Sequence, residues 1–296
     1  MHSATRKCFV LLLGGVALGF VRPALGQTAD AIIAKARAYV GSEAALDAVT
    51  SIHFIGVMEP GKLAPGAPQP PKVNIEVIFQ KPYQQRIEVK GADTTDTTAL
   101  DGYAAWQQTL DTKDPNSWKL SVLSPDQIKR LRARTWENLS FYKGIDRCDG
   151  SVENLGPATV DGRPAVKLAF RHDADIVFFR YFDPETGKLL LTETEQGGSI
   201  REEGEIIVDG LRFAKRITQT LKGTDAKGQA VEQQLVMSFD RITLNEKFPE
   251  SDFEMPFPSQ SSQAPTADTG AAPVPPETQP QPGSPPNAPA APATAK

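Results

Sequence analysis

Cysteine and histidine are both scarce in this chain of 296 residues, which has two cysteines and three histidines. Cys8 falls in an amino-terminal segment that we expect to be removed, which leaves Cys148 without a partner for an internal disulfide. A domain without a disulfide must be held together by its hydrophobic core, and a chain of this length is long enough to build one.

Catalytic motifs are missing as well. The sequence has no Gly-x-Ser-x-Gly elbow, no glycine-rich loop of the kind that cradles phosphate, and no paired cysteine or histidine spacing typical of a metal site. We therefore expect that the protein is not an enzyme, and that it has no catalytic residue, no metal and no cofactor.

Two short patterns leave alternatives open. His172, Asp173 and Asp175 place an imidazole beside carboxylates, as in a metal site or in the acid–base pair of a hydrolase. The same residues fall between two predicted strands, where aspartate favours a turn, and the turn is the simpler interpretation. Cys148 could act as a nucleophile with His172, although a single thiol is more often buried and inert. His53 has no acid or cysteine nearby in the sequence, so a structural role is at least as probable as a chemical one.

The first 26 residues are typical of a secretory signal. A short basic start precedes an apolar run from Phe9 to Val21, and small residues follow at Ala24 and Gly26. The run is shorter than the roughly 20 residues that span a membrane, and Cys8 precedes it instead of standing at the cleavage point. We expect a periplasmic protein, secreted through a cleaved signal peptide and without a lipid anchor.

The charge of the chain argues against one class of partner. Loss of the signal segment removes three cations and no acid, so the formal charge of −4 becomes −7. An acidic surface disfavours nucleic acid, and we expect no nucleic-acid partner.

Residues 27–258 have the pattern of one domain that contains three helices. Apolar residues at helical spacing predict a helix over residues 29–40, with Lys35 and Arg37 turned away from its apolar stripe. Ser42 can cap a short second helix. Ser124 and Gln127 form a capping box that opens a third helix, expected to run to about Tyr142.

Alternating residues and hairpin turns predict that the rest of this domain is antiparallel sheet. Asp-Gly pairs at 101–102, 161–162 and 209–210, and Gly187 in a longer loop, are typical of hairpins. Helices of crossover length do not separate the later strands, which excludes a parallel sheet. Roughly ten or more strands are expected.

The segment from Phe79 to Trp106 resembles the LolA-like lipoprotein carrier family in the order of its residues, which is Phe79, Lys81-Pro82, Arg86, Asp101-Gly102 and Trp106. The resemblance extends over roughly residues 30–257. It implies a mainly β fold with helices (α+β), in which an incomplete antiparallel β-barrel wraps around lid helices. The apolar space between barrel and lids would take acyl chains.

The resemblance also implies a function and a site. The protein would be a periplasmic carrier or binding protein for lipid or for the acyl chains of lipoproteins, so its partner would be a lipid or a lipid-modified protein. Residues 32–49 and 128–142 would form the lids. The residues expected to line the cavity or lid are Val77, Phe79, Arg86, Trp106, Ile128, Leu131, Trp136, Leu139, Phe178 and Phe182.

Two surfaces have more than one interpretation. Alternation sends Phe178 and Phe182 to one face of their strand and Phe179 and Tyr181 to the other, as expected for either a cavity wall or a central strand of a closed core. Four cations lie largely outside the apolar stripe of the third helix: Lys129, Arg130, Arg132 and Arg134. They could meet anionic lipid headgroups or an acidic partner, or form a solvated helix face.

Residues 259–296 are dominated by proline, alanine and small polar residues, and we expect a disordered tail. The tail, a proline-rich loop at residues 60–71 and a polar turn after Trp106 are departures from the usual carrier pattern. These departures fit a diverged relative with another apolar ligand as well. The tail suggests an alternative function, an envelope structural or regulatory module that docks a membrane-bound or cell-wall partner through it. The tail could equally be an inert solubilising segment.

Overall fold

The computed structural model describes residues 27–61, 70–114, 116–224 and 230–256. The predicted signal segment, the predicted tail and most of the proline-rich loop lie outside the described residues. The chain divides into two compact units, Met1–Met255 and Pro256–Lys296, and every helix and strand named below belongs to the first.

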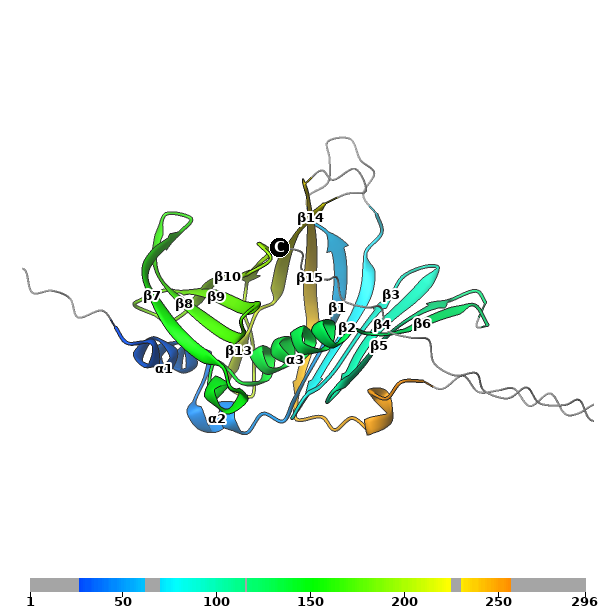
Figure 1. The fold of residues 1–296 in the computed structure, drawn as a ribbon, viewed down its shortest axis with the longest axis horizontal. Helices are drawn as coiled ribbons and strands as arrows, with labels where there is room; N and C mark the ends of the chain where they lie inside the picture. The colour runs from blue at the N-terminus through cyan, green and yellow to red at the C-terminus, as the bar shows by residue number, and fades with distance from the viewer. Residues whose placement is uncertain (1–26, 62–69, 115, 225–229, 257–296) are drawn as a thin grey trace, which may run out of the picture. The chain divides into compact units, whose positions relative to one another are not determined.

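Thirteen strands form one antiparallel sheet in the order β6-β5-β4-β3-β2-β1-β15-β14-β11-β10-β9-β8-β7 (Figure 1). The edge strands β6 and β7 are not paired with each other, so the sheet is open. The first half consists of β1 (Ser51–Pro60), β2 (Val73–Gln80), β3 (Gln84–Lys90), β4 (Thr94–Asp101), β5 (Ala104–Asp111) and β6 (Trp118–Val122). The mainly β class and the open antiparallel sheet predicted from the sequence are confirmed.

The second half of the sheet is built from the later part of the chain. It consists of β7 (Ser151–Val160), β8 (Arg163–Asp173), β9 (Ile176–Phe182), β10 (Leu189–Thr194), β11 (Ser199–Glu203), β14 (Arg216–Thr224) and β15 (Ala230–Leu244). A separate hairpin contains β12 (Ile206–Val208) and β13 (Leu211–Phe213). Asp161-Gly162 and Asp209-Gly210 have positive φ at both residues, as the predicted two-residue turns require.

Three α-helices are present among the described residues, each with a side-chain cap. They are α1 (Ala29–Val40), α2 (Glu43–Asp47) and α3 (Pro125–Leu139). The Ser42 hydroxyl accepts from the backbone of Ala45, and Ser124 and Gln127 form the predicted capping box of α3. Two short 3-10 helices, η1 (Ile145–Cys148) and η2 (Glu250–Asp252), complete the elements.

All three helices pack on one face of the sheet, which we name the helix face. Leu46 of α2 belongs to a buried cluster with Phe54 of β1, and Ile32 of α1 packs with Phe178 of β9. Leu131 of α3 packs against strands β4 and β5. We name the opposite side the outer face. Its small cluster includes Tyr181, so Phe178 and Tyr181 separate onto the two faces as the alternation predicted.

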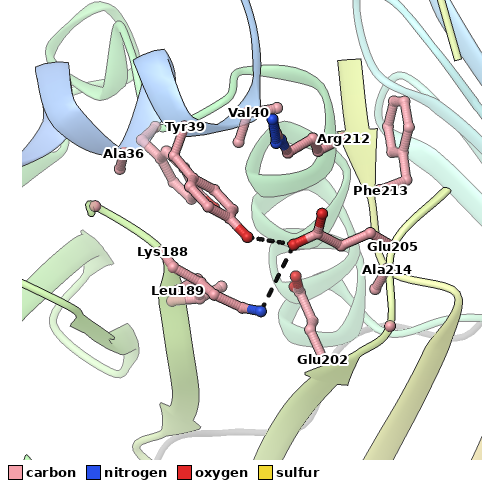
Figure 2. Close-up of a pocket in the computed structure, with 13 residues that line it drawn as sticks. Ala36, Tyr39, Val40, Lys188, Leu189, Glu202, Glu205, Arg212, Phe213 and Ala214 are labelled. Carbon is pink, nitrogen blue, oxygen red and sulfur yellow. Dashed lines mark hydrogen bonds and ion pairs between the residues drawn. The ribbon is translucent and has the colours of Figure 1, made fainter. Parts of the chain in front are cut away.

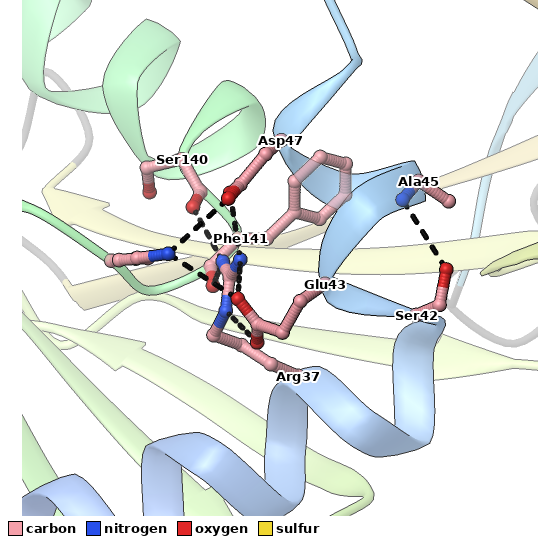
Figure 3. A network of polar contacts seen from close by, with 8 residues as sticks. Arg37, Ser42, Glu43, Ala45, Asp47, Ser140 and Phe141 are labelled. Carbon is pink, nitrogen blue, oxygen red and sulfur yellow. Dashed lines mark hydrogen bonds and ion pairs between the residues drawn. The ribbon is translucent and has the colours of Figure 1, made fainter.

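Arg37 is buried instead of exposed, and it contacts the point where α3 ends earlier than expected. The predicted exposed arginine is only 3 % exposed, because its guanidinium bonds Glu43 of α2 and the carbonyl oxygens of Ser140 and Phe141 (Figure 3). The helix α3 ends at Leu139 instead of Tyr142, and Phe141 has a positive φ of 48°. Arg37 thus donates hydrogen bonds to carbonyl groups at the end of α3 that have no partner within the helix.

Candidate ligand-binding site

Several apolar side chains on the helix face remain partly exposed, and we name five of them the apolar strip: Met58, Ile87, Val89, Ile217 and Met237. Met237 of β15 lies opposite both Met58 of β1 and Ile217 of β14. Ile87 of β3 lies opposite Val77, which is buried in the same cluster. Because opposite residues project to the same side, strands that are distant in sequence bring the strip together.

The helix α3 changes character along its length. Its buried residues, Ala133, Thr135, Glu137 and Leu139, all lie in its second half. The first half, up to Arg132, is exposed or only partly buried, although it carries the apolar residues Ile128 and Leu131. The second half therefore anchors the helix, and the first half is held less firmly.

A cavity of about 180 Å³ lies beside α3, which we name the α3 cavity. Its walls come from α3, the β2–β3 turn, η1 and the β8–β9 hairpin, and its lining residues are Tyr83, Lys129, Arg132, Ala133, Trp136, Cys148, His172, Asp173 and Ile176. Burial, followed by the contact with Cys148, raises the pKa of Tyr83 to about 12. Sites for drug-sized ligands usually measure about 300–1,000 Å³. The α3 cavity therefore has room for only part of an acyl chain.

A buried ionic group stands between α3 and the strands β8 and β9. Glu137 accepts from His172 Nε2 at 2.6 Å, and its other oxygen lies 2.5 Å from Arg180 Nη2. All three side chains are less than a tenth exposed. The Trp136 ring packs edge-on against His172, with a centroid separation of 5.2 Å. The group therefore fixes the second half of α3 to the sheet.

A second cavity, of about 40 Å³, lies between α1 and the strands β10, β11 and β13 (Figure 2). The Tyr39 hydroxyl donates to Glu205, and Lys188 Nζ lies 3.7 Å from the same carboxylate. Desolvation, followed by the bond to Glu205, raises the pKa of Tyr39 to about 12. This space suits a few water molecules at most, so it is not a site for an acyl chain.

The structure distributes the predicted site residues over several clusters. Val77, Phe79 and Leu139 are buried in the central cluster of the helix face, and Phe178 and Phe182 in the cluster under α1 and α3. The remaining helix residues are Ile128 and Leu131, packed on β4 and β5, and Trp136, which also lines the α3 cavity. One common cavity does not bring these residues together in the part of the chain that the structure describes.

Arg86 and Trp106 lie on the outer face and cannot line space beneath α3. Trp106 follows Ala105, which contacts the α3 side, and its indole N–H donates to the Phe253 carbonyl at 2.8 Å. Arg86 lies in register with Ala99, which is paired with Trp106, and it forms an ion pair with Glu88. Their placement corrects the site expected from the family resemblance.

The basic residues of α3 are largely paired within the protein. Lys129 lies 3.4 Å from Asp173, and Arg130 pairs with Asp175 and Glu195. The guanidinium carbon of Arg132 stands 4.1 Å from the ring centre of Tyr83 and 3.8 Å from that of Tyr103. Arg134 has no ion-pair partner within 4.0 Å among the described residues.

The His172 segment also differs from its prediction. Strand β8 extends to Asp173, so the turn consists of Ala174 and Asp175 and excludes His172. His172, Asp173 and Asp175 contact three different residues of α3 and do not form an acid–base group with one another. Among the described residues, no cluster of three or more potential ligands is arranged to hold a metal. No helix in the same residues has both the length and the apolar character needed to span a membrane.

His53 joins separate elements of the sheet. Its ring nitrogens lie 2.8 Å from Glu76 and 2.9 Å from Glu246, and its side chain is buried. These bonds join β1 to β2 and to the segment after β15, neither of which neighbours His53 in the sequence.

Sequence reasoning missed Arg180 and all five residues of the apolar strip as site residues. Arg180 lies two residues from Phe178 and two from Phe182, so alternation alone places all three on the helix face. The strip had a weaker signal, because Met237 and Ile217 come from late strands whose pairing with β1 depends on long-range register.

No family model and no curated protein matches the sequence. Among solved structures, the chain is similar to a DUF1329 family protein from Desulfovibrio piger, with 10 % identity and a TM-score of 0.47 over 76 % of this chain and 96 % of the other. It is also similar to a Vibrio parahaemolyticus domain assigned to outer membrane lipoprotein sorting, with 11 % identity and a TM-score of 0.45 over 75 % and 94 %.

A third similar structure is the lipoprotein LppX of Mycobacterium tuberculosis, with 13 % identity and a TM-score of 0.28 over 75 % of this chain and 99 % of the other. The resemblance to lipoprotein-sorting proteins that the sequence predicted thus recurs among these structures. Each TM-score lies below 0.5, so function is inferred from this chain's own residues.

Proposed function

We propose that the protein binds the acyl chain of a lipid or lipid-modified protein on the helix face, between the apolar strip and α3. The observation that carries this proposal is the strip itself, because five neighbouring apolar side chains remain partly exposed on the face that the helices cover. Contiguous exposed apolar surface marks a binding site more often than a single exposed residue does.

The energetics suit an acyl ligand. Each buried methylene group contributes about 0.8 kcal/mol, so ten methylenes would contribute about 8 kcal/mol before the cost of association. Recognition of this kind depends on apolar area and shape, and it needs no catalytic group.

The first half of α3 serves as the movable cover in this proposal. Ile128 and Leu131 are only partly buried, and the polar contacts of the first half, such as that of Arg130 with Asp175, lie at the surface, whereas the buried contacts of the helix are in its second half. Displacement of the first half would enlarge the space beside the α3 cavity enough for a longer chain. The two lids predicted from the sequence are thereby reduced to one, since α1 and α2 are tied into the buried clusters.

The wider role of a periplasmic carrier stays a prediction, because residues 1–26 and the tail lie outside the described residues. Delivery to a partner would require the protein to pick up and release its ligand in the envelope. The alternative role, docking of a protein through the tail, likewise stays a prediction.

Uptake of a fluorescent acyl probe by the purified mature protein tests the proposal. The double variant Met58→Gln, Met237→Gln keeps side-chain length but makes the strip polar, and we expect it to bind the probe at least about ten-fold more weakly. Val57→Gln is the matched control, since Val57 neighbours Met58 on the outer face. Absence of uptake by the unmodified protein, or an equal loss in the control, would contradict the proposal.

A further inference from the structure

Arg180 points from β9 into the interior beneath α3, between Phe178 and Phe182. Its side chain is 9 % exposed. Two of its nitrogens, Nε and Nη1, have no hydrogen-bond partner among the described residues. Only Nη2 has a close carboxylate, that of Glu137.

Unpartnered donors of this kind are costly. Leaving a buried polar group without a partner costs about 1–3 kcal/mol, and more when the group is charged. Folded proteins leave few such groups, so each one calls for an explanation. A ligand that supplies oxygen acceptors would remove the cost, and Arg180 would then be a binding residue.

The guanidinium is held in place before any ligand arrives. Its central carbon lies 4.7 Å from the ring centre of Tyr142 and 5.1 Å from that of Phe170. Glu137, which contacts Nη2, is itself fixed by His172. A fixed guanidinium loses little side-chain entropy on binding, which favours recognition by its free N–H groups.

Strand register connects Arg180 to the apolar strip. Arg180 lies opposite Thr192, Thr192 opposite Ile200, and Ile200 opposite Gln219 of β14. Gln219 is two residues from Ile217, so it shares the face of the strip. Three strand spacings separate Arg180 from β14, which is about 14 Å and within the reach of a long acyl chain.

Both positive and negative side chains lie near the route from Arg180 to the apolar strip. Arg134, one helical turn before Glu137 on α3, is exposed and has no ion-pair partner within 4.0 Å among the described residues. Glu202 of β11 lies opposite Ile217 of the apolar strip, on the same face as Ile200, and it is exposed to solvent. Because this carboxylate is exposed, the surrounding water screens its repulsion of an anion at Arg180.

We propose that Arg180 binds the anionic oxygen group, a carboxylate or a phosphate, of an amphiphile whose acyl chain lies on the apolar strip. This inference rests on the proposed function and names the ligand class of the same site. The headgroup accepts hydrogen bonds from Nε or Nη1, while Glu137 keeps its contact with Nη2.

Competition binding with three amphiphiles of equal chain length tests the inference on the mature full chain. The probes are palmitic acid, a palmitoyl lysophosphatidic acid and palmityl alcohol. We expect at least one anionic probe to bind about ten-fold or more tightly than the alcohol, because a hydrogen bond to a charged group is worth about 1.5–3 kcal/mol. The better of the two anions identifies the headgroup as carboxylate or phosphate.

The double variant Glu137→Gln, Arg180→Met removes both charges and leaves neither one unpaired. We expect it to bind the alcohol as the unmodified protein does and to lose the preference for anions. Arg201→Met is the matched control, because Arg201 of β11, two strands away from β9, pairs with Asp161 at the surface, and it should keep the preference.

Three outcomes would overturn the inference. If the unmodified protein binds the alcohol as tightly as both anions, acyl binding stands and the anion site does not. The same conclusion follows if the double variant folds and keeps its preference. If no probe binds, the proposed function fails together with this inference. The comparison of headgroups on the unmodified protein decides the question even if the double variant does not fold.

Discussion

Arg37 Nη1 donates a hydrogen bond to the Phe141 carbonyl oxygen at 2.8 Å, between residues 104 positions apart in the sequence. The same guanidinium bonds Glu43 of α2 at 2.7 Å through both Nε and Nη2. One side chain of α1 therefore ties α2 to the end of α3. This contact sets where α3 stops and anchors the half of the helix that does not move in the proposed mechanism.

Replacement of Arg37 should destabilise the domain. Arg37→Met leaves the Ser140 and Phe141 carbonyls and the Glu43 carboxylate without their partner, and we expect a loss of about 2 kcal/mol in the free energy of unfolding. Half of the network is solvent-exposed, which keeps the loss below that of a fully buried pair. Urea denaturation measures it. Arg171→Met, which removes an exposed pair with Glu153, should change stability by less than about 0.5 kcal/mol, and an equal loss in both variants would contradict the account.

The same network predicts a dependence of stability on pH. Hydrogen bonding from Arg37, with a smaller contribution from Lys143, lowers the pKa of Glu43 from 4.5 to about 2. A carboxylate with a depressed folded pKa stabilises above its unfolded pKa and loses that contribution as the pH falls through the folded pKa. The stability advantage of the unmodified protein over Glu43→Gln should therefore shrink between about pH 5 and pH 2. A difference that stays constant over this interval would refute the assignment.

The capping box should control local opening of α3. Ser124→Ala removes the acceptor for the Gln127 amide, and we expect about 1 kcal/mol less stability in the first turn. Hydrogen exchange of the amides in residues 127–132 should accelerate, while amides in the anchored second half keep their protection. Uniform acceleration along α3 would show that the helix opens as one unit, against the proposed division.

Features with local causes were predictable from the sequence. The capping box of α3 needs only Ser124 and Gln127, and the hairpin turns need only an Asp-Gly pair. The alternation of β9 placed Phe178 and Tyr181 on opposite faces because side chains in a strand alternate whatever the fold. The open antiparallel sheet followed from the same local patterns and from the family resemblance.

Features with distant partners were not predictable from local patterns. Arg37 looked exposed because its partners at residues 43 and 140–141 come from other elements, and helix periodicity gives no sign of them. Trp106 matched a family position, yet strand register places it on the outer face against Phe253. The site expected from the resemblance therefore contained correct core residues and two from the wrong face.

Photo-crosslinking with a diazirine-bearing fatty acid tests the central claim, that an acyl chain lies on the helix face along the apolar strip. After irradiation of the mature protein, mass spectrometry of its peptides locates the modified residues. The account predicts adducts on Met58, Ile217 or Met237 that unlabelled palmitic acid suppresses. Adducts confined to outer-face or exposed residues such as Val57 and Trp118, or no specific adducts, would contradict it.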